Sequence, residues 1–248
     1  MTDLALSVVI PAYNEAERIS PTLRATHAWL AARGEPFELL VVDDGSRDRT
    51  REVVTALCAE LPGLRLIAST PNHGKGHVVG VGMRAARGRL RLFMDADNAT
   101  PVSELPKLVA ALAGGEGVAI GSRRAPGALQ KVKQPLYRRL WSRLANRVVQ
   151  AGLLDGIRDT QCGFKLLSAA AAEAVFARAR EAGWGFDLEI LALARRLGFA
   201  IVEVPVDWTD DRRSRIHPIR DALRITREFV RIRGAFRRGD YDLPPRAS

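Results

Sequence analysis

The sequence predicts an α/β fold in which a mostly parallel sheet is flanked by helices. Short apolar runs alternate with segments of helical length through the first half of the chain, which is typical of β-α-β units. Several runs stop at acidic or glycine-rich turns, and open sheets of this kind bind ligands at such strand ends. With 248 residues, of which 47% are hydrophobic, the chain can bury a substantial core. We therefore expect one large domain, or one domain with an appendage.

Each expected element is an apolar stretch bounded by turn residues. Strands are expected at 4–11, 37–42, 64–68, 90–94, 118–120 and, in the second half, 201–208. Helices of the first half are expected at 15–33, 50–61, 76–86 and 103–113. Gly34 closes the first helix, Pro62 follows the second, and the glycine-rich turn 72–76 opens the third.

The pattern changes after Gly121. Apolar residues recur every four positions between 136 and 148, a second apolar stripe runs from 216 to 230, and arginines recur on another face of both segments. This pattern predicts two amphipathic helices with basic flanks. Such helices can lie in a membrane interface or pack on the domain as ordinary surface helices, and the pattern fits both. The tail at 239–248 is expected to be flexible.

The net charge of +10 lies in the second half of the chain. Residues 1–122 hold 13 Lys and Arg against 14 Asp and Glu, whereas residues 123–248 hold 25 against 14. The partner of the second half is therefore expected to be anionic: phosphate groups, lipid headgroups or nucleic acid. Nucleic acid is disfavoured, because few aromatic residues interleave with the arginines and no DNA- or RNA-binding motif is present. A generally basic protein without such a partner is the alternative.

Cysteine usage and hydropathy argue against several classes of protein. Cys58 and Cys162 form neither a disulfide framework nor a metal-binding spacing, so free thiols in a reducing compartment are expected. The N-terminus shows no basic segment followed by an apolar core, so we expect no signal peptide. No apolar run reaches the roughly 18 residues of a transmembrane helix. These features predict a cytoplasmic protein.

The most informative residues are Asp95 and Asp97, which directly follow the expected strand at 90–94. Residues two apart on an extended chain point the same way, so both carboxylates can face one spot beyond the strand. Two hard oxygen ligands, with room for phosphate oxygens and water, suit Mg²⁺ or Mn²⁺. A solvated pair of loop residues is the alternative for so short a motif, and other segments of the chain decide between the two.

Two other strand ends carry side chains suited to a nucleotide. Tyr13 offers a ring to stack on a base, and Glu15 can hydrogen-bond a base or ribose or complement a helix N-terminus. Asp44, after the second strand, can accept hydrogen bonds from a base N–H or a ribose hydroxyl. The structural alternative is a turn followed by a helix cap from Ser46 or Asp48.

The glycine-rich turn at 72–76 matches no nucleotide-binding motif. The Walker A pattern fails because Gly76, followed by His77, stands where Ser or Thr is required after Lys75, and residue 69 is Ser where the first Gly is required. Lys75 can nevertheless place a positive charge near a phosphate or a sugar. His73 and His77 can meet on one helix face, but no third ligand is near in the sequence, so no zinc site is expected.

The second half contributes three polar segments. Asp159 and Lys165 lie in a short polar stretch that we expect to be bracketed by helices. Asp187 and Glu189 stand just before an expected apolar helix, where acids also favour a helix N-terminus. The arginine-rich segment 212–215 follows the expected strand at 201–208 and can close on phosphates.

These segments, in this order, resemble family-2 glycosyltransferases of the GT-A fold. In the first half the resemblance rests on residues 8–15, 42–46, 72–76 and 95–97. The second half resembles the dolichyl- and polyprenyl-phosphate sugar transferases at residues 121–123, 159–165, 184–189 and 204–209. The Asp-Thr-Gln-Cys-Gly-Phe-Lys run at 159–165 is more similar to the β-glucosyltransferase branch than to the related mannosyltransferases.

The resemblance implies a role for each candidate residue. The donor nucleoside is expected to bind at Pro11, Tyr13, Glu15 and Asp44, with Lys75 near the phosphates or the sugar. Mg²⁺ or Mn²⁺ is expected across the donor diphosphate at Asp95 and Asp97. Donor or acceptor phosphates are expected at Arg123, Ser214 and Arg215. The acceptor site is expected to include Asp187, Glu189 and Lys165, with Asp159 orienting the acceptor or acting as a base.

Two features depart from the family pattern. Members often carry Gly-Ser-Lys near the end of the domain, whereas this chain has Arg213-Ser214-Arg215. Eukaryotic members of the glucosyl branch carry an N-terminal membrane anchor, and no such segment is present here. The basic helices are therefore the expected contact with an anionic membrane surface, where each arginine contributes about 1 kcal/mol.

The function that the resemblance implies is metal-dependent, inverting transfer of a hexose, glucose from UDP-glucose, to a polyprenyl phosphate on the cytoplasmic face of a membrane. Residues 1–122 would form the donor and metal half of the domain and residues 123–238 the acceptor half. A lipid phosphate needs little activation, because its second pKa is about 6. The alternatives are mannosyl transfer from GDP-mannose, and transfer to a saccharide hydroxyl, which needs a carboxylate base. A nucleic-acid-binding protein is the alternative outside enzymes.

Overall fold

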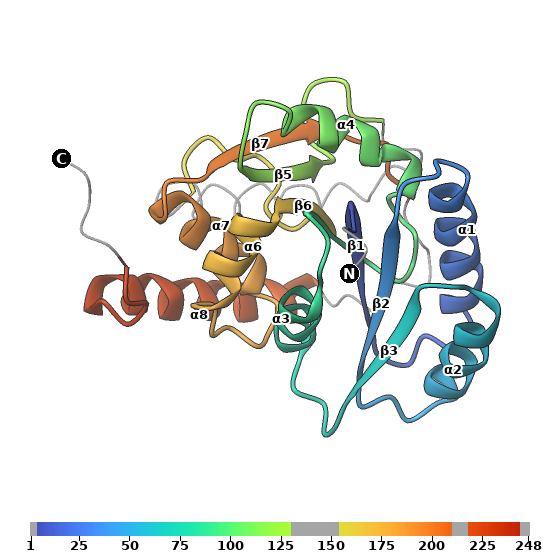
Figure 1. Cartoon of the computed structure of the whole chain (residues 1–248). Coiled ribbons are helices and arrows are strands. Elements are labelled where there is room, and N and C mark those ends of the chain that lie inside the picture. Colours follow the sequence, from blue (N-terminus) through green and yellow to red (C-terminus); the bar gives the residue numbers. More distant parts are fainter. Residues whose placement is uncertain (1–3, 130–153, 210–217, 244–248) are drawn as a thin grey trace.

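The computed structural model describes residues 4–129, 154–209 and 218–243, and it confirms the expected α/β fold. A seven-stranded sheet runs through the molecule in the order β3-β2-β1-β4-β6-β5-β7 (Figure 1). The strands are β1 (Leu6–Ala12), β2 (Phe37–Asp44), β3 (Leu64–Ser69), β4 (Leu90–Met94), β5 (Gly117–Ser122), β6 (Phe164–Ser168) and β7 (Ala200–Pro205).

The sheet is parallel apart from one strand. β1 pairs in parallel with both β2 and β4, and β2 pairs in parallel with β3. β6 lies antiparallel between β4 and β5, and β7 pairs in parallel with β5 at the edge. The segment 159–165, which we expected to be bracketed by helices, therefore runs into a central strand. All five residues of this short strand are buried, Lys165 among them, and so short a run that includes a lysine gave too weak a strand pattern in the sequence.

Helices cover both faces of the sheet. They are α1 (Ile19–Ala31), α2 (Thr50–Glu60), α3 (Lys75–Ala85), the 3₁₀ helix η1 (Val102–Glu104), α4 (Leu105–Ala111), α6 (Ala169–Phe176), α7 (Phe186–Arg196) and α8 (Pro218–Arg238). One core lies under α1, α2 and α4, and the other under α3, α6, α7 and part of α8 (Figure 1). Parallel strands covered on both faces explain the unbroken apolar runs in the sequence.

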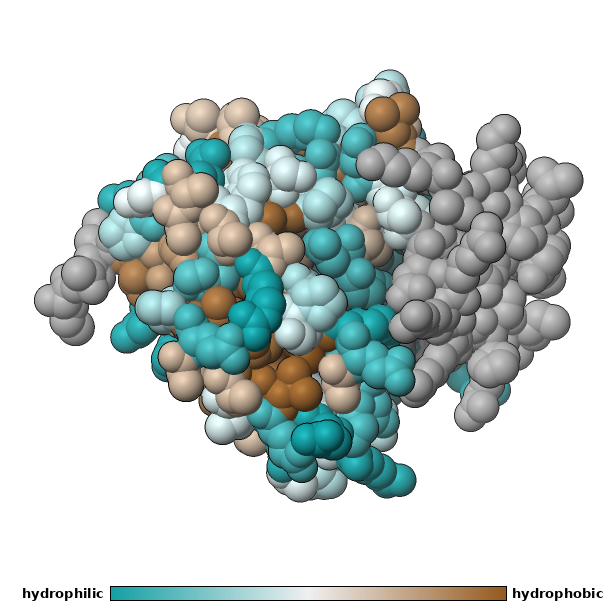
Figure 2. Space-filling model, turned by 90° about the vertical axis from the view of Figure 1, so that its right-hand side faces the viewer, coloured by the Kyte–Doolittle hydropathy of each residue, from teal (hydrophilic) through white to brown (hydrophobic). Residues whose placement is uncertain are grey.

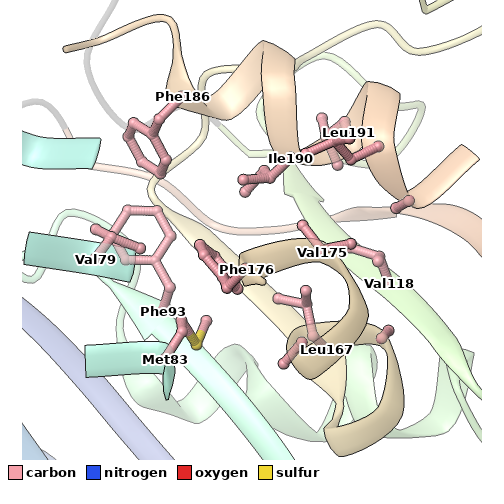
Figure 3. Close-up of a cluster of buried hydrophobic side chains, with 14 of the residues drawn as sticks. Val79, Met83, Phe93, Val118, Leu167, Val175, Phe176, Phe186, Ile190 and Leu191 are labelled. Carbon is pink, nitrogen blue, oxygen red and sulfur yellow. The ribbon is translucent and has the colours of Figure 1, made fainter. Parts of the chain in front are cut away.

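The second core supports the strand that carries the two acids. Figure 3 shows Phe93 of β4 among Val79, Met83 and Phe186, and the rings of Phe93 and Phe186 meet edge to face with centroids 5.6 Å apart. All four side chains are buried. Such close packing fixes the end of β4 against α3 and α7, since interiors of this density resist displacement.

Several element boundaries differ from the expected ones. The first helix begins at Ile19 instead of residue 15, because Asn14 takes a positive φ of 55° and turns the chain before the helix. The helix expected at 103–113 is divided into η1 and α4, with Pro106 in the first turn of α4. Asp187 and Glu189 lie inside the first turn of α7, not ahead of it.

The expected basic helices are only partly described. The segment 136–148 and the residues Ser214 and Arg215 lie outside the described residues, whereas the second helix is present as α8. Among the helices that are described, none combines the length and the apolar character needed to cross a bilayer. On the side that carries α1 and α2, Figure 2 shows hydrophobic residues as small separate patches among hydrophilic ones.

Candidate active site

The acidic motifs of the first half meet at one edge of the sheet. β1, β2 and β4 are neighbouring parallel strands, so their carboxyl ends lie side by side (Figure 1). Tyr13 and Glu15 follow β1, Asp44 ends β2, and Asp95 follows β4. Ligands bind at this edge of open α/β sheets. The register therefore brings together side chains that are far apart in the sequence.

The carboxylates of Asp95 and Asp97 form the centre of this edge. Asp97 Oδ1 accepts a hydrogen bond from the Ala99 N–H at 3.0 Å. Burial, followed by the neighbouring charge of Asp95, raises the pKa of Asp97 above its usual value. Each of these effects disfavours two negative charges, and a bound dication would relieve both. The pair therefore fits a divalent metal.

A glycine in the second half makes room for Asp95. The Asp95 N–H donates to the Gly163 carbonyl at 3.0 Å. A Cβ at position 163 would lie only 1.9 Å from Asp95 Oδ2, so a side chain there would displace the carboxylate. The 159–163 segment thus packs against Asp95 at Gly163, a contact that sequence spacing alone did not show.

Among the described residues, no additional acidic or histidine ligand joins the pair of Asp95 and Asp97. Within residues 4–129, 154–209 and 218–243, no three His, Cys, Asp or Glu side chains lie close enough to hold a metal by themselves. The rings of His73 and His77 do meet, with centroids 4.5 Å apart. A metal at Asp95 and Asp97 would therefore take its other ligands from substrate and water, as Mg²⁺ does in many phosphate-transfer sites.

Lys75 is the cation nearest to the acids in the described part. Its Nζ lies 2.6 Å from Asp95 Oδ1 and is flanked by the rings of Trp184 and Phe93, at 5.0 and 5.3 Å from their centroids. Burial by itself would lower the pKa of Lys75, but the charges of Asp95 and Asp187 outweigh it and raise the pKa. The ammonium group is therefore charged and held beside Asp95.

The residues expected to bind the donor nucleoside surround this centre. Glu15 forms an ion pair with Arg18 at 2.7 Å, and burial raises its pKa, with further contributions from Asp97 and Asp95. Tyr13 is 40% exposed, so part of its side chain is open to a ligand, whereas Pro11 is buried in β1. The carboxylate of Glu15 thus lies close enough to Asp95 and Asp97 for their charges to affect its pKa.

The two acids that end β2 are both engaged with the backbone. Asp44 accepts hydrogen bonds from the His73 and Gly74 N–H groups at 2.8 and 2.9 Å, which fixes the glycine-rich turn. Asp43 binds Arg51 at 2.5 Å through Oδ2, while its buried Oδ1 has no hydrogen-bond partner among the described residues. Sequence reasoning singled out Asp44 and missed Arg51, which gave no signal beyond its charge.

Arg123 and Asp159 form a buried ion pair that sequence reasoning did not connect. The guanidinium binds both carboxylate oxygens, at 2.7 and 2.8 Å, and the Arg123 N–H adds a third bond at 2.9 Å. Burial opposes ionisation of Asp159, but Arg123 outweighs it and holds the pKa of this carboxyl well below its usual range. Asp159 is therefore a weak proton acceptor and a strong anchor for Arg123.

The three residues expected in the acceptor site are all buried. Lys165 and Asp187 form an ion pair in which Lys165 Nζ also binds the Cys162 carbonyl at 2.6 Å. Burial raises the pKa of Asp187, although Lys165 and Lys75 oppose the shift. Glu189 accepts from the Glu181 N–H and the Tyr241 hydroxyl, both at 2.8 Å. These buried side chains bind neighbouring protein groups and hold the surrounding loops in place.

The comparisons with known proteins agree with this geometry. The family model of glycosyl transferase family 2 matches residues 7–176, and the chain belongs to this family of glycosyltransferases. It is 35% identical to dolichyl-phosphate beta-glucosyltransferase ALG5C of Trichomonas vaginalis, over 99% of this chain and 76% of the relative. It is also 35% identical to the dolichyl-phosphate beta-glucosyltransferase of Saccharomyces cerevisiae, over 96% and 77% of the two chains.

A solved structure shows the same fold. Glucosyl-3-phosphoglycerate synthase from Mycobacterium tuberculosis, in complex with Mn²⁺, UDP-glucose and phosphoglyceric acid, matches with a TM-score of 0.68 at 21% identity. The match covers 93% of this chain and 80% of that chain. The family and the GT-A fold that the motifs implied are thereby confirmed.

Proposed function

We propose that this glycosyltransferase moves glucose from UDP-glucose to a polyprenyl phosphate, with Mg²⁺ or Mn²⁺ as its cofactor. The observation that carries the proposal is the Asp95 and Asp97 pair, which lies with Lys75 at the carboxyl edge of the sheet. Support for the sugar and the acceptor comes from relatives at 35% identity that are dolichyl-phosphate beta-glucosyltransferases.

The donor would lie along the edge formed by β1, β2 and β4. Its nucleoside would meet Pro11, Tyr13, Glu15 and Asp44, of which Tyr13 has the exposed ring. Its diphosphate would lie over Asp95 and Asp97, where a bound metal would neutralise the charge that develops on the leaving group. Lys75 adds a fixed positive charge beside the same acids.

The acceptor would meet the donor near Arg123. An oxygen of the lipid phosphate would bond to the anomeric carbon from the face opposite the nucleotide, and the electrons of the breaking bond would leave with UDP, which inverts the configuration. Because the phosphate is already an anion, this step requires no base. The ion pair with Asp159 fixes the direction of the Arg123 guanidinium, so we assign Asp159 an orienting role. Ser214 and Arg215 stay proposed phosphate contacts.

The buried acceptor-site candidates would act through their neighbours. Asp187 and Lys165 hold the region behind Lys75, and Glu189 fixes the loop that follows α6. This arrangement favours a phosphate acceptor over a saccharide hydroxyl, because Asp159 is bound to Arg123 and no longer serves as a free base.

We place the protein at the cytoplasmic face of a membrane, without contact to nucleic acid. Phe229 and Ile232 turn one side of α8 into the core, while Arg227, Arg233 and Arg237 are exposed on the rest of the helix. Exposed arginines attract anionic lipid headgroups and so keep the enzyme near a lipid acceptor.

The test measures transfer of labelled sugar from UDP-glucose and from GDP-mannose to a polyprenyl phosphate in detergent, with Mn²⁺ or with EDTA. We expect labelling from UDP-glucose, its loss with EDTA, and a decrease of at least about 100-fold for Asp97→Asn. Asp155→Asn, at an exposed position, is the matched control. Labelling from GDP-mannose alone would show that GDP-mannose, not UDP-glucose, is the donor. Metal-dependent donor hydrolysis without lipid labelling would refute the lipid acceptor.

A further inference from the structure

Trp184 is an exposed aromatic residue for which the proposed reaction has so far no use. Its side chain is 43% exposed, and the other aromatic residue among the exposed large hydrophobic side chains of the described part is Tyr13. Phe186, two residues further on, is buried. An indole at the edge of a functional site presents an apolar ring face that a ligand can contact.

The indole borders the metal site. Its ring centroid lies 5.0 Å from Lys75 Nζ, and the same nitrogen lies 2.6 Å from Asp95 Oδ1. Because both distances are measured from Lys75 Nζ, the distance between the centre of the indole and Asp95 Oδ1 is at most the sum of the two. A pyranose joined to a diphosphate above Asp95 and Asp97 would reach across that distance. Trp184 thus lies within reach of the transferred sugar of a donor bound at Asp95 and Asp97.

The loop that carries Trp184 is held in place from three sides. The Ala182 carbonyl accepts the Gly76 N–H at 2.8 Å, which joins the loop to the start of α3. Glu189 accepts the Glu181 N–H at 2.8 Å, and Arg231 of α8 binds the Glu181 carboxylate. A Cβ at Gly76 would lie 2.3 Å from the Glu181 carbonyl, so α3 and the loop touch directly. The indole is therefore preorganised, which lowers the entropic cost of binding.

We propose that Trp184 is the platform on which the hexose of the donor rests, against the exposed part of the indole that the Lys75 ammonium over the ring leaves open. Lys75 is there placed to bind the sugar hydroxyls or the adjacent phosphate. One face of a pyranose presents C–H groups, and the negative face of an indole attracts such slightly positive groups while it shields them from water. The inference rests on the proposed function, since it requires a nucleotide-sugar donor at Asp95 and Asp97.

The test compares two dissociation constants by titration calorimetry with Mn²⁺: that of UDP and that of UDP-glucose. Trp184→Ala is expected to weaken UDP-glucose binding about tenfold, the loss of roughly 50 Å² of apolar contact, and to leave UDP binding within about twofold. Trp184→Phe keeps a ring and is expected to lose no more than about threefold. Trp29→Phe is the matched control, since Trp29 lies near the C-terminal end of α1, where its ring packs against the Arg33 guanidinium.

A second readout protects the test against loss of folding. UDP-glucose is expected to change the tryptophan fluorescence of the wild type and of Trp29→Phe more than UDP does, and this difference is expected to vanish in Trp184→Phe. Circular dichroism checks the fold of each variant. If Trp184→Phe shows the same UDP-glucose signal as the wild type, the assignment is overturned.

The remaining outcomes separate the inference from the proposed function. Equal weakening of UDP and UDP-glucose in Trp184→Ala would overturn the platform, because the side chain would then support the site as a whole. Unchanged donor binding with a raised KM for polyprenyl phosphate would move Trp184 to the acceptor and overturn the platform too. If the wild type binds none of UDP, UDP-glucose, GDP and GDP-mannose, the proposed function is overturned, and the platform with it.

Discussion

Asp159→Asn tests how much the buried ion pair between Asp159 and Arg123 stabilises the fold. Asp159 is 2% exposed and meets Arg123 through three hydrogen bonds of 2.7, 2.8 and 2.9 Å. The amide keeps the shape but removes the negative charge that faces the guanidinium of Arg123, whose side chain is 23% exposed. Removing one member of such a pair costs about 3–5 kcal/mol. A protein of this size would lose roughly 6–20 °C in Tm.

Urea denaturation followed by circular dichroism measures this loss, with Asp155→Asn as control. Asp155 is exposed, and its replacement is expected to change the free energy of unfolding by less than about 0.5 kcal/mol. An unchanged m-value would show that the denatured state is the same. A loss below about 1 kcal/mol for Asp159→Asn would refute the ion-pair argument.

The pH dependence of the same pair has a definite sign. Arg123 lowers the pKa of Asp159 in the folded protein, so the pair stabilises the fold above the unfolded pKa of about 3.9. This contribution is lost as the pH falls from there toward the lower folded value. The difference in stability between wild type and Asp159→Asn is therefore expected to be constant from about pH 8 to 5 and to shrink below about pH 4. A difference that instead changes between pH 6 and 8 would contradict this assignment.

The other predictions concern Gly163 and Tyr241. Gly163→Ala places a Cβ 1.9 Å from Asp95 Oδ2, so calorimetry is expected to show at least about tenfold weaker binding of Mn²⁺ with UDP; Gly114→Ala, with open space around it, is the control. Equal affinities would show that the carboxylate does not depend on this contact. Tyr241→Phe removes the hydroxyl that donates to buried Glu189, and thermal denaturation is expected to show a loss of about 1–3 kcal/mol; Tyr13→Phe, at an exposed position, is expected to show none. An unchanged Tm for Tyr241→Phe would mean that Glu189 needs only its backbone partners.

Much of the fold could be read from the sequence, because parallel strands buried on both faces leave continuous apolar runs. The strand over Leu90–Met94 and the helix from Thr50 have the expected positions. The antiparallel strand β6 was not expected, since five residues that include a lysine carry too weak a pattern. Only its neighbours β4 and β5 on either side make Lys165 part of a sheet.

The sequence by itself determined which acids stand at strand ends, since Asp44 and Asp95 follow apolar runs that stop there. It also determined the family, because four motifs in one order are specific together. Only the tertiary structure decided which charges meet: Lys75 with Asp95, Arg123 with Asp159, and Lys165 with Asp187. Each pair joins residues 20 or more positions apart, and a side chain's burial and partner depend on how the strands are ordered in the sheet. Local patterns carry no information about that order.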